Sequence, residues 1–100
     1  MDSMEGFKKS QRVGKLTNSL AQDLSSTSVE GSSPDGKVKV VLDCQQRPLR
    51  VDIDDNYFQM ADRADMSNAV LLAMLSAYSK SIEKMDDKMK SYYNDLGLKS

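Results

Sequence analysis

The carboxylates Asp52, Asp54 and Asp55 form the densest group of potential ligands in the sequence. In a strand with a period of two residues, Asp52 and Asp54 share one face and could in principle hold a hard cation. Arg50 shares that face and moderates its charge, so a solvated strand face explains the pattern better. We therefore expect no metal site and no cofactor.

The sequence has few residues that could form a catalytic nucleophile and its base, because it contains one cysteine, Cys44, and no histidine. Histidine is the commonest general base and the commonest metal ligand, and a serine nucleophile would lack its usual partner. Arg47 could modestly activate the Cys44 thiol, but no second cysteine is present to resolve an intermediate. The glycine-containing turn at residues 31–36 lacks the following Lys-Ser/Thr of a phosphate-binding loop. We expect a protein that is not an enzyme, in a reducing compartment.

The basic residues suggest a different chemistry, contact with phosphates. Residues 1–50 carry eight basic and six acidic residues, whereas residues 51–100 carry six and nine. The formal net charge is −1, so any attraction to nucleic acid must be local, and two copies of the chain would double it. A solvated polar face accounts equally well for any one of these residues. The candidates for DNA binding, chosen by charge alone, are Lys8, Lys9, Arg12, Lys15, Lys37, Lys39, Arg47 and Arg50.

The elements that position these residues begin with a helix. Apolar residues recur at spacings of three and four from Val13 to Leu24. This period predicts a helix that begins near Met4 or Lys8 and ends near Leu24. We expect residues 1–6 to be frayed.

Two segments with alternating apolar and polar residues, 37–43 and 49–54, predict two half-buried strands joined as a hairpin. Pro48 must lie at the margin of this hairpin because it has no N–H to donate. Residues 25–30 could add a third strand before the turn at residues 31–36. The apolar residues expected to face the core are Val38, Val40, Leu42, Leu49, Val51 and Ile53.

A long helix is predicted from Asp62 or Asp65 to Leu96, because this stretch contains neither Gly nor Pro and Gly97 follows it. Such a helix would be about 50 Å long at 1.5 Å per residue. Its apolar residues keep a period of 3.5 over more than three heptads, as in helices that pair with another helix. This seam, the predicted dimer interface, consists of Leu71, Leu75, Tyr78, Ile82, Met85, Met89, Tyr92 and Leu96.

The partner of this seam is open at the level of sequence. Met66, Val70, Ala73 and Ala77 widen the apolar face of the first half, which we expect to pack on the sheet. Beyond Ile82 only the narrow seam remains, and it requires another helix. That helix could be the N-terminal helix of the same chain or the same helix of a second copy, and we favour the second copy.

The chain contains no apolar run near the ~20 residues needed to span a bilayer. Lys8, Lys9 and Arg12 are not followed by the apolar region of a signal peptide. The expected architecture is a single α+β domain over residues 1–100, with an N-terminal helix, a small antiparallel sheet of three strands and a long C-terminal helix.

The strand pair resembles a known signature. Residues 36–42 read Gly-Lys-Val-Lys-Val-Val-Leu and residues 49–54 read Leu-Arg-Val-Asp-Ile-Asp, while residues 29–31 read Val-Glu-Gly. These segments resemble the "G-x-V-K-V", "V-x-I-D" and "V-x-G" elements of the YbaB/EbfC family of nucleoid-associated proteins. The chain departs from that pattern at Cys44, where the family usually has glycine, and at residues 77–81, where it usually reads "A-x-N-D-A".

The resemblance implies a tweezer-shaped dimer that binds DNA with little sequence preference, located on the nucleoid in the bacterial cytoplasm. Plastids carry relatives too, with proposed roles in protein targeting and translation in the stroma. The expected partners are therefore a second copy of the chain and DNA, or other proteins if the chain is an adaptor of the same fold. Neither membrane insertion nor a small-molecule substrate is expected.

Overall fold

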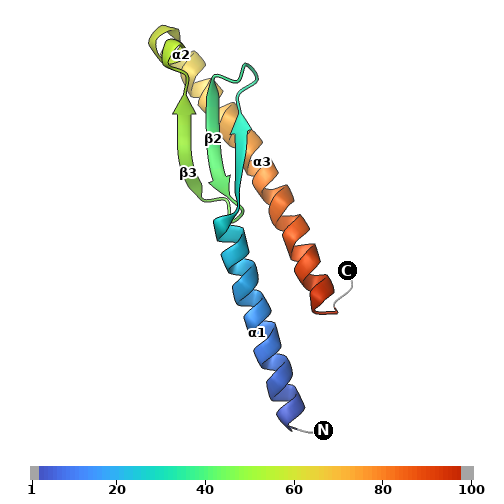
Figure 1. The fold of residues 1–100 in the computed structure, drawn as a ribbon. Helices are drawn as coiled ribbons and strands as arrows, with labels where there is room; N and C mark the ends of the chain where they lie inside the picture. Colours follow the sequence, from blue (N-terminus) through green and yellow to red (C-terminus); the bar gives the residue numbers. More distant parts are fainter. Residues whose placement is uncertain (1–2, 98–100) are drawn as a thin grey trace.

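The computed structural model describes residues 3–97, with side chains placed at residues 14, 15 and 17–97. The chain forms an elongated body of 70 × 21 × 15 Å (Figure 1). The predicted N-terminal helix, three antiparallel strands and long C-terminal helix are all present. In chain order the elements are α1 (Ser3–Ser26), β1 (Ser28–Ser32), β2 (Val38–Asp43), β3 (Pro48–Ile53), α2 (Asp55–Met60) and α3 (Arg63–Asp95).

The three strands form one antiparallel sheet in the order β1-β2-β3. Helix α3 lies across one face of this sheet and packs against β1 and β2 (Figure 1). It presents a row of small residues spaced by four, so the helix axis comes close to the strands. The buried apolar cluster between the two layers consists of Val38, Val40, Leu42, Ala69, Ala73 and Ala77.

The first strand lies later in the chain than the predicted residues 25–30, because α1 continues to Ser26. Gly31, expected in the turn, is inside β1 and passes directly over α3. A Cβ at this position would lie 2.0 Å from the backbone nitrogen of Ala77. A glycine is therefore required here for the sheet to approach the helix this closely.

The prediction that β3 buries its apolar face is wrong for the isolated chain. Val51 pairs with Val40 and so shares the face that α3 covers, yet Val51 is 47% exposed and Leu49 is 56% exposed. The reason is the width of the sheet: α3 packs on β1 and β2 and leaves the edge strand uncovered. Ile53, at the end of β3, is partly buried against the core cluster.

A short helix, α2, was not expected from the sequence. The strand predicted to include Asp54 ends at Ile53, and the Asp54 carboxylate instead accepts a hydrogen bond from the Tyr57 backbone N–H at 3.1 Å. Asp54 is thus the N-cap of α2 rather than part of a charged strand face. Asp52 forms an ion pair with Arg50 at 2.7 Å.

The boundaries of the long helix agree with the sequence. Asp62 is its N-cap and accepts a hydrogen bond from the Asp65 backbone N–H at 2.8 Å. At the other end Leu96 is the C-cap, and Gly97 has a positive φ of 76°, a conformation that glycine adopts without strain.

The substitution Gly31→Ala should destabilise the fold by about 2 kcal/mol or more, because a methyl group cannot fit between β1 and the α3 backbone. Chemical denaturation at fixed protein concentration measures this cost. Gly14→Ala is the matched control: apart from its own helix and chain neighbours, no described atom lies within 4 Å of a Cβ there, and alanine favours the helix. Equal stability of the two variants would contradict the proposed packing.

Candidate nucleic-acid interface and pairing surface

The basic residues at the start of the sequence lie on a helix that extends away from the sheet. Helix α1 runs alongside the C-terminal half of α3 and then continues beyond its end (Figure 1). Lys15 is exposed. The predicted residues Lys8, Lys9 and Arg12 belong to this helix, but their side chains lie outside the described ones. Residues 6–22 contain four basic and no acidic residues, so we call this segment the basic arm.

The base of the arm is fixed to the rest of the fold. Leu24 is buried, and the Cys44 backbone N–H donates to the carbonyl oxygens of Leu24 and Thr27 at 3.0 and 3.1 Å. Lys88 of α3 forms an ion pair with Asp23 at 2.9 Å. The hydrogen bond from Lys88 holds the pKa of Asp23 below its ordinary value. These contacts set the direction in which the arm leaves the sheet.

The hairpin turn that receives the arm is organised by Asp43, a buried carboxylate that the sequence did not single out. Its oxygens accept hydrogen bonds from the backbone N–H groups of Gln45 and Arg47 and from Arg47 Nε, at 2.8 to 3.0 Å. Burial alone would raise its pKa, but these hydrogen bonds outweigh burial and keep the pKa below its ordinary value. Asp43 therefore remains ionised and holds the turn closed.

Ser81 ties the same turn to α3. Its hydroxyl donates to the backbone carbonyl of Asp43 at 2.6 Å and accepts from the side-chain amide of Gln46 at 3.0 Å. Gln46 has a positive φ of 63°, so the strained position of the turn is Gln46 rather than Cys44. One sequence signal could have revealed Ser81: it continues the four-residue spacing of Ala73 and Ala77.

The remaining candidate basic residues lie on or beside the sheet and are interleaved with acids. Arg47 pairs with Asp43 and Arg50 pairs with Asp52, both within 2.8 Å. Lys39 lies opposite Asp52 in the β2–β3 register. Lys37 is exposed just before β2. The eight candidates thus fall into an arm group, with no acid within residues 6–22, and a sheet group of mixed charge.

The seam of α3 divides into two parts. In the first half, Leu71, Leu75 and Tyr78 are 52 to 55% exposed, although the same half of the helix buries its alanine row against the sheet. The second half of the seam is partly buried where α1 runs alongside it. The residues concerned are Ile82, Met85, Met89, Tyr92 and Leu96.

This differs from the expected arrangement, in which the stretch after Ile82 was the part in need of a partner. Helix α1 of the same chain packs beside that stretch and partly covers it. The apolar residues of α3 that stay uncovered are Leu71, Leu75 and Tyr78. At 100° per residue, Leu71 and Leu75 each lie about 160° around α3 from Ala73, which is buried against the sheet, so these two residues face away from the sheet. We call Leu71, Leu75 and Tyr78 the open apolar face; Leu49 and Val51 form a separate exposed apolar surface on β3.

Other chemistries find no support in residues 3–97. Cys44 is fully buried, and burial raises the pKa of its thiol although Lys88 and Lys84 oppose this effect. A thiol in this environment is not activated. No group of His, Cys, Asp and Glu in the described part of the chain could hold a metal ion, and none of its helices has the length and apolarity to cross a membrane.

Comparison with known proteins places these features in a family. The YbaB/EbfC DNA-binding family matches residues 1–96. A nucleoid-associated protein of Prochlorococcus marinus (strain MIT 9313) is 36% identical over 95 residues, covering 94% of this chain and 82% of that protein. A nucleoid-associated protein of Gloeothece citriformis is also 36% identical, over 94 residues, with the same shares of both chains.

The fold has a counterpart among solved structures. An uncharacterized protein from Helicobacter pylori superposes with a TM-score of 0.74 over 91% of this chain and 96% of that one, at 19% identity. This likeness supports the arrangement of helix, three-stranded sheet and long helix found here.

Loss of the Asp43 charge should weaken the fold in a pH-dependent way. Because its folded pKa is lowered, Asp43 stabilises the protein above its unfolded pKa of about 3.9, and this contribution disappears as the pH falls through the folded value. Thermal unfolding from pH 7 to pH 3 should therefore show a smaller acid-induced loss of stability for Asp43→Asn than for the wild type. Asp52→Asn, which removes an exposed carboxylate from the other face of the sheet, is the matched control. Identical profiles for Asp43→Asn and the wild type would contradict this role.

Proposed function

Because this chain belongs to the YbaB/EbfC DNA-binding family, we propose that it acts as a homodimeric nucleoid-associated protein whose basic arms contact DNA phosphates. The observation that carries this proposal is the arm itself. It places four positive charges within residues 8–15 of α1, which extends beyond the body of the fold; the acids of this helix, Glu5 and Asp23, lie outside the arm. A family of DNA-binding proteins is not an enzyme family, in agreement with the absence of histidine.

The arm is a better DNA contact than the sheet. Arg47 and Arg50 are engaged with carboxylates, and Lys39 faces Asp52, so the field of the sheet face largely cancels. Binding would then depend on charge rather than on base edges, since phosphate contacts carry no sequence information. Little sequence preference is the expected consequence. Lys37 and Lys39 would add secondary contacts.

The open apolar face supports the homodimer. Leu71, Leu75 and Tyr78 expose about half of their surface each. A second copy related by a twofold axis would place the same surface opposite itself and cover both copies at once. It would also place two basic arms on one particle, which doubles the charge available to a DNA duplex.

A protein adaptor of the same fold, for example in a plastid stroma, is the second candidate. The net charge of −1 and the pairing of Arg47 and Arg50 with acids favour it. A pull-down with the full chain separates the two: partners that are retained after nuclease treatment support the adaptor, whereas loss of all partners supports DNA binding.

Removal of the arm charges tests the DNA contact. The variant Lys8→Gln/Lys9→Gln/Arg12→Gln/Lys15→Gln should bind duplex DNA about a hundredfold or more weakly at low salt. The slope of log affinity against log salt should fall by up to about 7 for a dimer, at roughly 0.9 per lost phosphate contact. Fluorescence anisotropy with a labelled duplex at several salt concentrations measures both quantities.

A triple variant of α3, Lys80→Gln/Lys84→Gln/Lys90→Gln, is the control for this experiment. These lysines are interleaved with acids, and Lys90 pairs with Asp86 at 3.2 Å. The control should change affinity and slope only slightly. A larger effect from the control than from the arm variant would show that the arm is not the principal contact.

The dimer is tested by placing a charge on the open apolar face. Leu75→Asp should leave the monomer folded, because Leu75 is 55% exposed, but it should shift the protein to monomer by burying a charge in the interface. Sedimentation velocity measures the mass and circular dichroism confirms folding. Glu83→Asp introduces the same side chain on the polar side of α3 and should remain dimeric. A monomeric wild type would refute the homodimer.

A further inference from the structure

The two ends of the molecule carry opposite charge. Residues 6–22 hold four basic and no acidic residues, whereas residues 54–65 hold four Asp and one Arg. The first segment lies in α1 and the second covers α2 and the start of α3, at the opposite end of a molecule 70 Å long (Figure 1). Each chain therefore presents a basic arm at one end and an acidic surface at the other.

The acidic end also has a shaped surface. A depression of about 340 Å³ opens between the turn after β1 and the first turns of α3. Asp35 and Asp65 are among its lining residues, together with Tyr57 and Leu72. The Tyr57 hydroxyl donates to the Asp65 backbone carbonyl at 3.1 Å and so fixes the ring in the wall.

Asp35 is held in its ionised form. The backbone N–H of Lys37 and the Ser33 hydroxyl donate to its carboxylate at 3.1 and 2.7 Å, which keeps its pKa below the ordinary value. The depression thus combines fixed negative charge with apolar walls. That combination suits Lys and Arg side chains, whose methylene stems pack on apolar surface while the charged group reaches a carboxylate.

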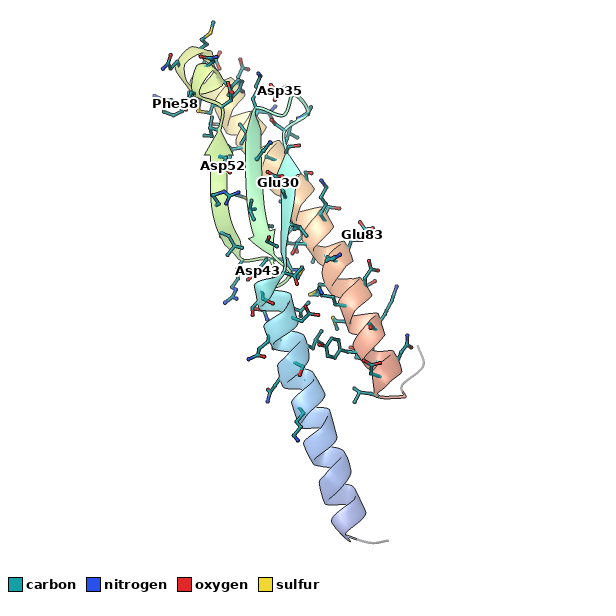
Figure 2. The ribbon with its side chains drawn as sticks, in the orientation of Figure 1. Glu30, Asp35, Asp43, Asp52, Phe58 and Glu83 are labelled. Atoms are coloured by element: carbon teal, nitrogen blue, oxygen red, sulfur yellow. The ribbon has the colours of Figure 1, made fainter. Side chains whose placement is uncertain are left out.

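The depression lies beside the open apolar face and does not coincide with it. At 3.6 residues per turn, Leu72 lies about 120° around α3 from Tyr78 and about 60° from Leu75, and the lining residues Asp35 and Tyr57 belong to other elements. The same end of the molecule exposes Phe58 and Met60 of α2, which are 62% and 85% exposed. Figure 2 shows Phe58 and Asp35 together at this end, remote from α1.

We propose that the depression lined by Asp35, Asp65, Tyr57 and Leu72 receives the basic arm of a second dimer, so that dimers associate head to tail. The arm has the matching chemistry, since Lys8, Arg12 and Lys15 each adjoin an apolar residue in the sequence, namely Phe7, Val13 and Leu16. Contact between two different surfaces does not close on itself and can add dimers in a row. DNA phosphates compete for the same lysines, so DNA binding and this association are linked. This association depends on the proposed function in one respect: it takes the homodimer as the unit that associates.

Sedimentation velocity of the full chain without DNA tests this association. At about 50 mM salt the mass should rise above that of the dimer with increasing protein concentration, and at about 500 mM it should return to the dimer, because screening weakens the contact. Asp35→Asn/Asp65→Asn should weaken the association at low salt about tenfold or more. Asp52→Asn/Asp86→Asn removes the same charge elsewhere and should associate like the wild type.

Charge reversal gives the stricter test. Dimers with Asp65→Lys and dimers with Lys8→Glu/Arg12→Glu should each remain dimeric at low salt, whereas their mixture should associate, because the reversed arm then meets a reversed depression. The proposal is overturned if the wild type stays dimeric at every concentration, if the mixture fails to associate, or if Asp35→Asn/Asp65→Asn yields monomers. No DNA is present, so these outcomes are independent of whether the arm binds DNA.

Discussion

The close packing of α3 on β1 and β2 is the contact on which the rest of the structure depends. Gly31 in β1 meets Ala77 with no room for a side chain, and Ala73 lies beside it. Small residues on both sides let a single helix cover two strands closely rather than three loosely. The third strand is left uncovered as a result, while Leu71 and Leu75 lie on the other side of α3. The core of the monomer follows from this one choice of residue size.

Asp43 and Ser81 extend the same contact into a polar link. The buried carboxylate closes the β2–β3 turn, and the Ser81 hydroxyl ties that turn to α3. The adjacent Cys44 backbone N–H donates hydrogen bonds to the carbonyl oxygens of Leu24 and Thr27, and these bonds hold the end of α1 against the turn. A buried polar group is costly unless its hydrogen bonds are satisfied, and here they also fix the direction of the basic arm. The direction of the basic arm is therefore set by a turn more than 20 residues away in the sequence.

The sequence predicted the periodic elements well. The alternation around Val40 and the heptad spacing through Leu75 identified the β2–β3 hairpin and the long helix, and Asp62 and Gly97 predicted its ends. It could not predict that Val51 would be exposed, because alternation shows which face a residue occupies but not whether another element covers that face. For the same reason it assigned the unpaired part of the seam to the residues after Ile82.

Candidate site residues were only partly accessible to sequence reasoning. Charge identified both Lys15 and Arg50, but it could not show that Arg50 is held by Asp52. The role of Asp43 could not be predicted from the sequence, because a carboxylate at the end of a strand is usually solvated. Its burial follows from the fold of the turn, and no local pattern encodes it. The turn around Asp43 is thus formed by contacts between segments that are distant in the sequence, and not by a sequence motif.

The central claim is that the basic arm, and not the polar side of α3, lies against DNA. Site-specific photocrosslinking tests it most directly, with a photoreactive residue introduced at Asn18, an exposed position in the arm, or at Glu83 on α3. Irradiation of the full chain bound to duplex DNA should crosslink DNA from position 18 and leave position 83 uncrosslinked. Crosslinks from position 83 without any from position 18 would contradict the account.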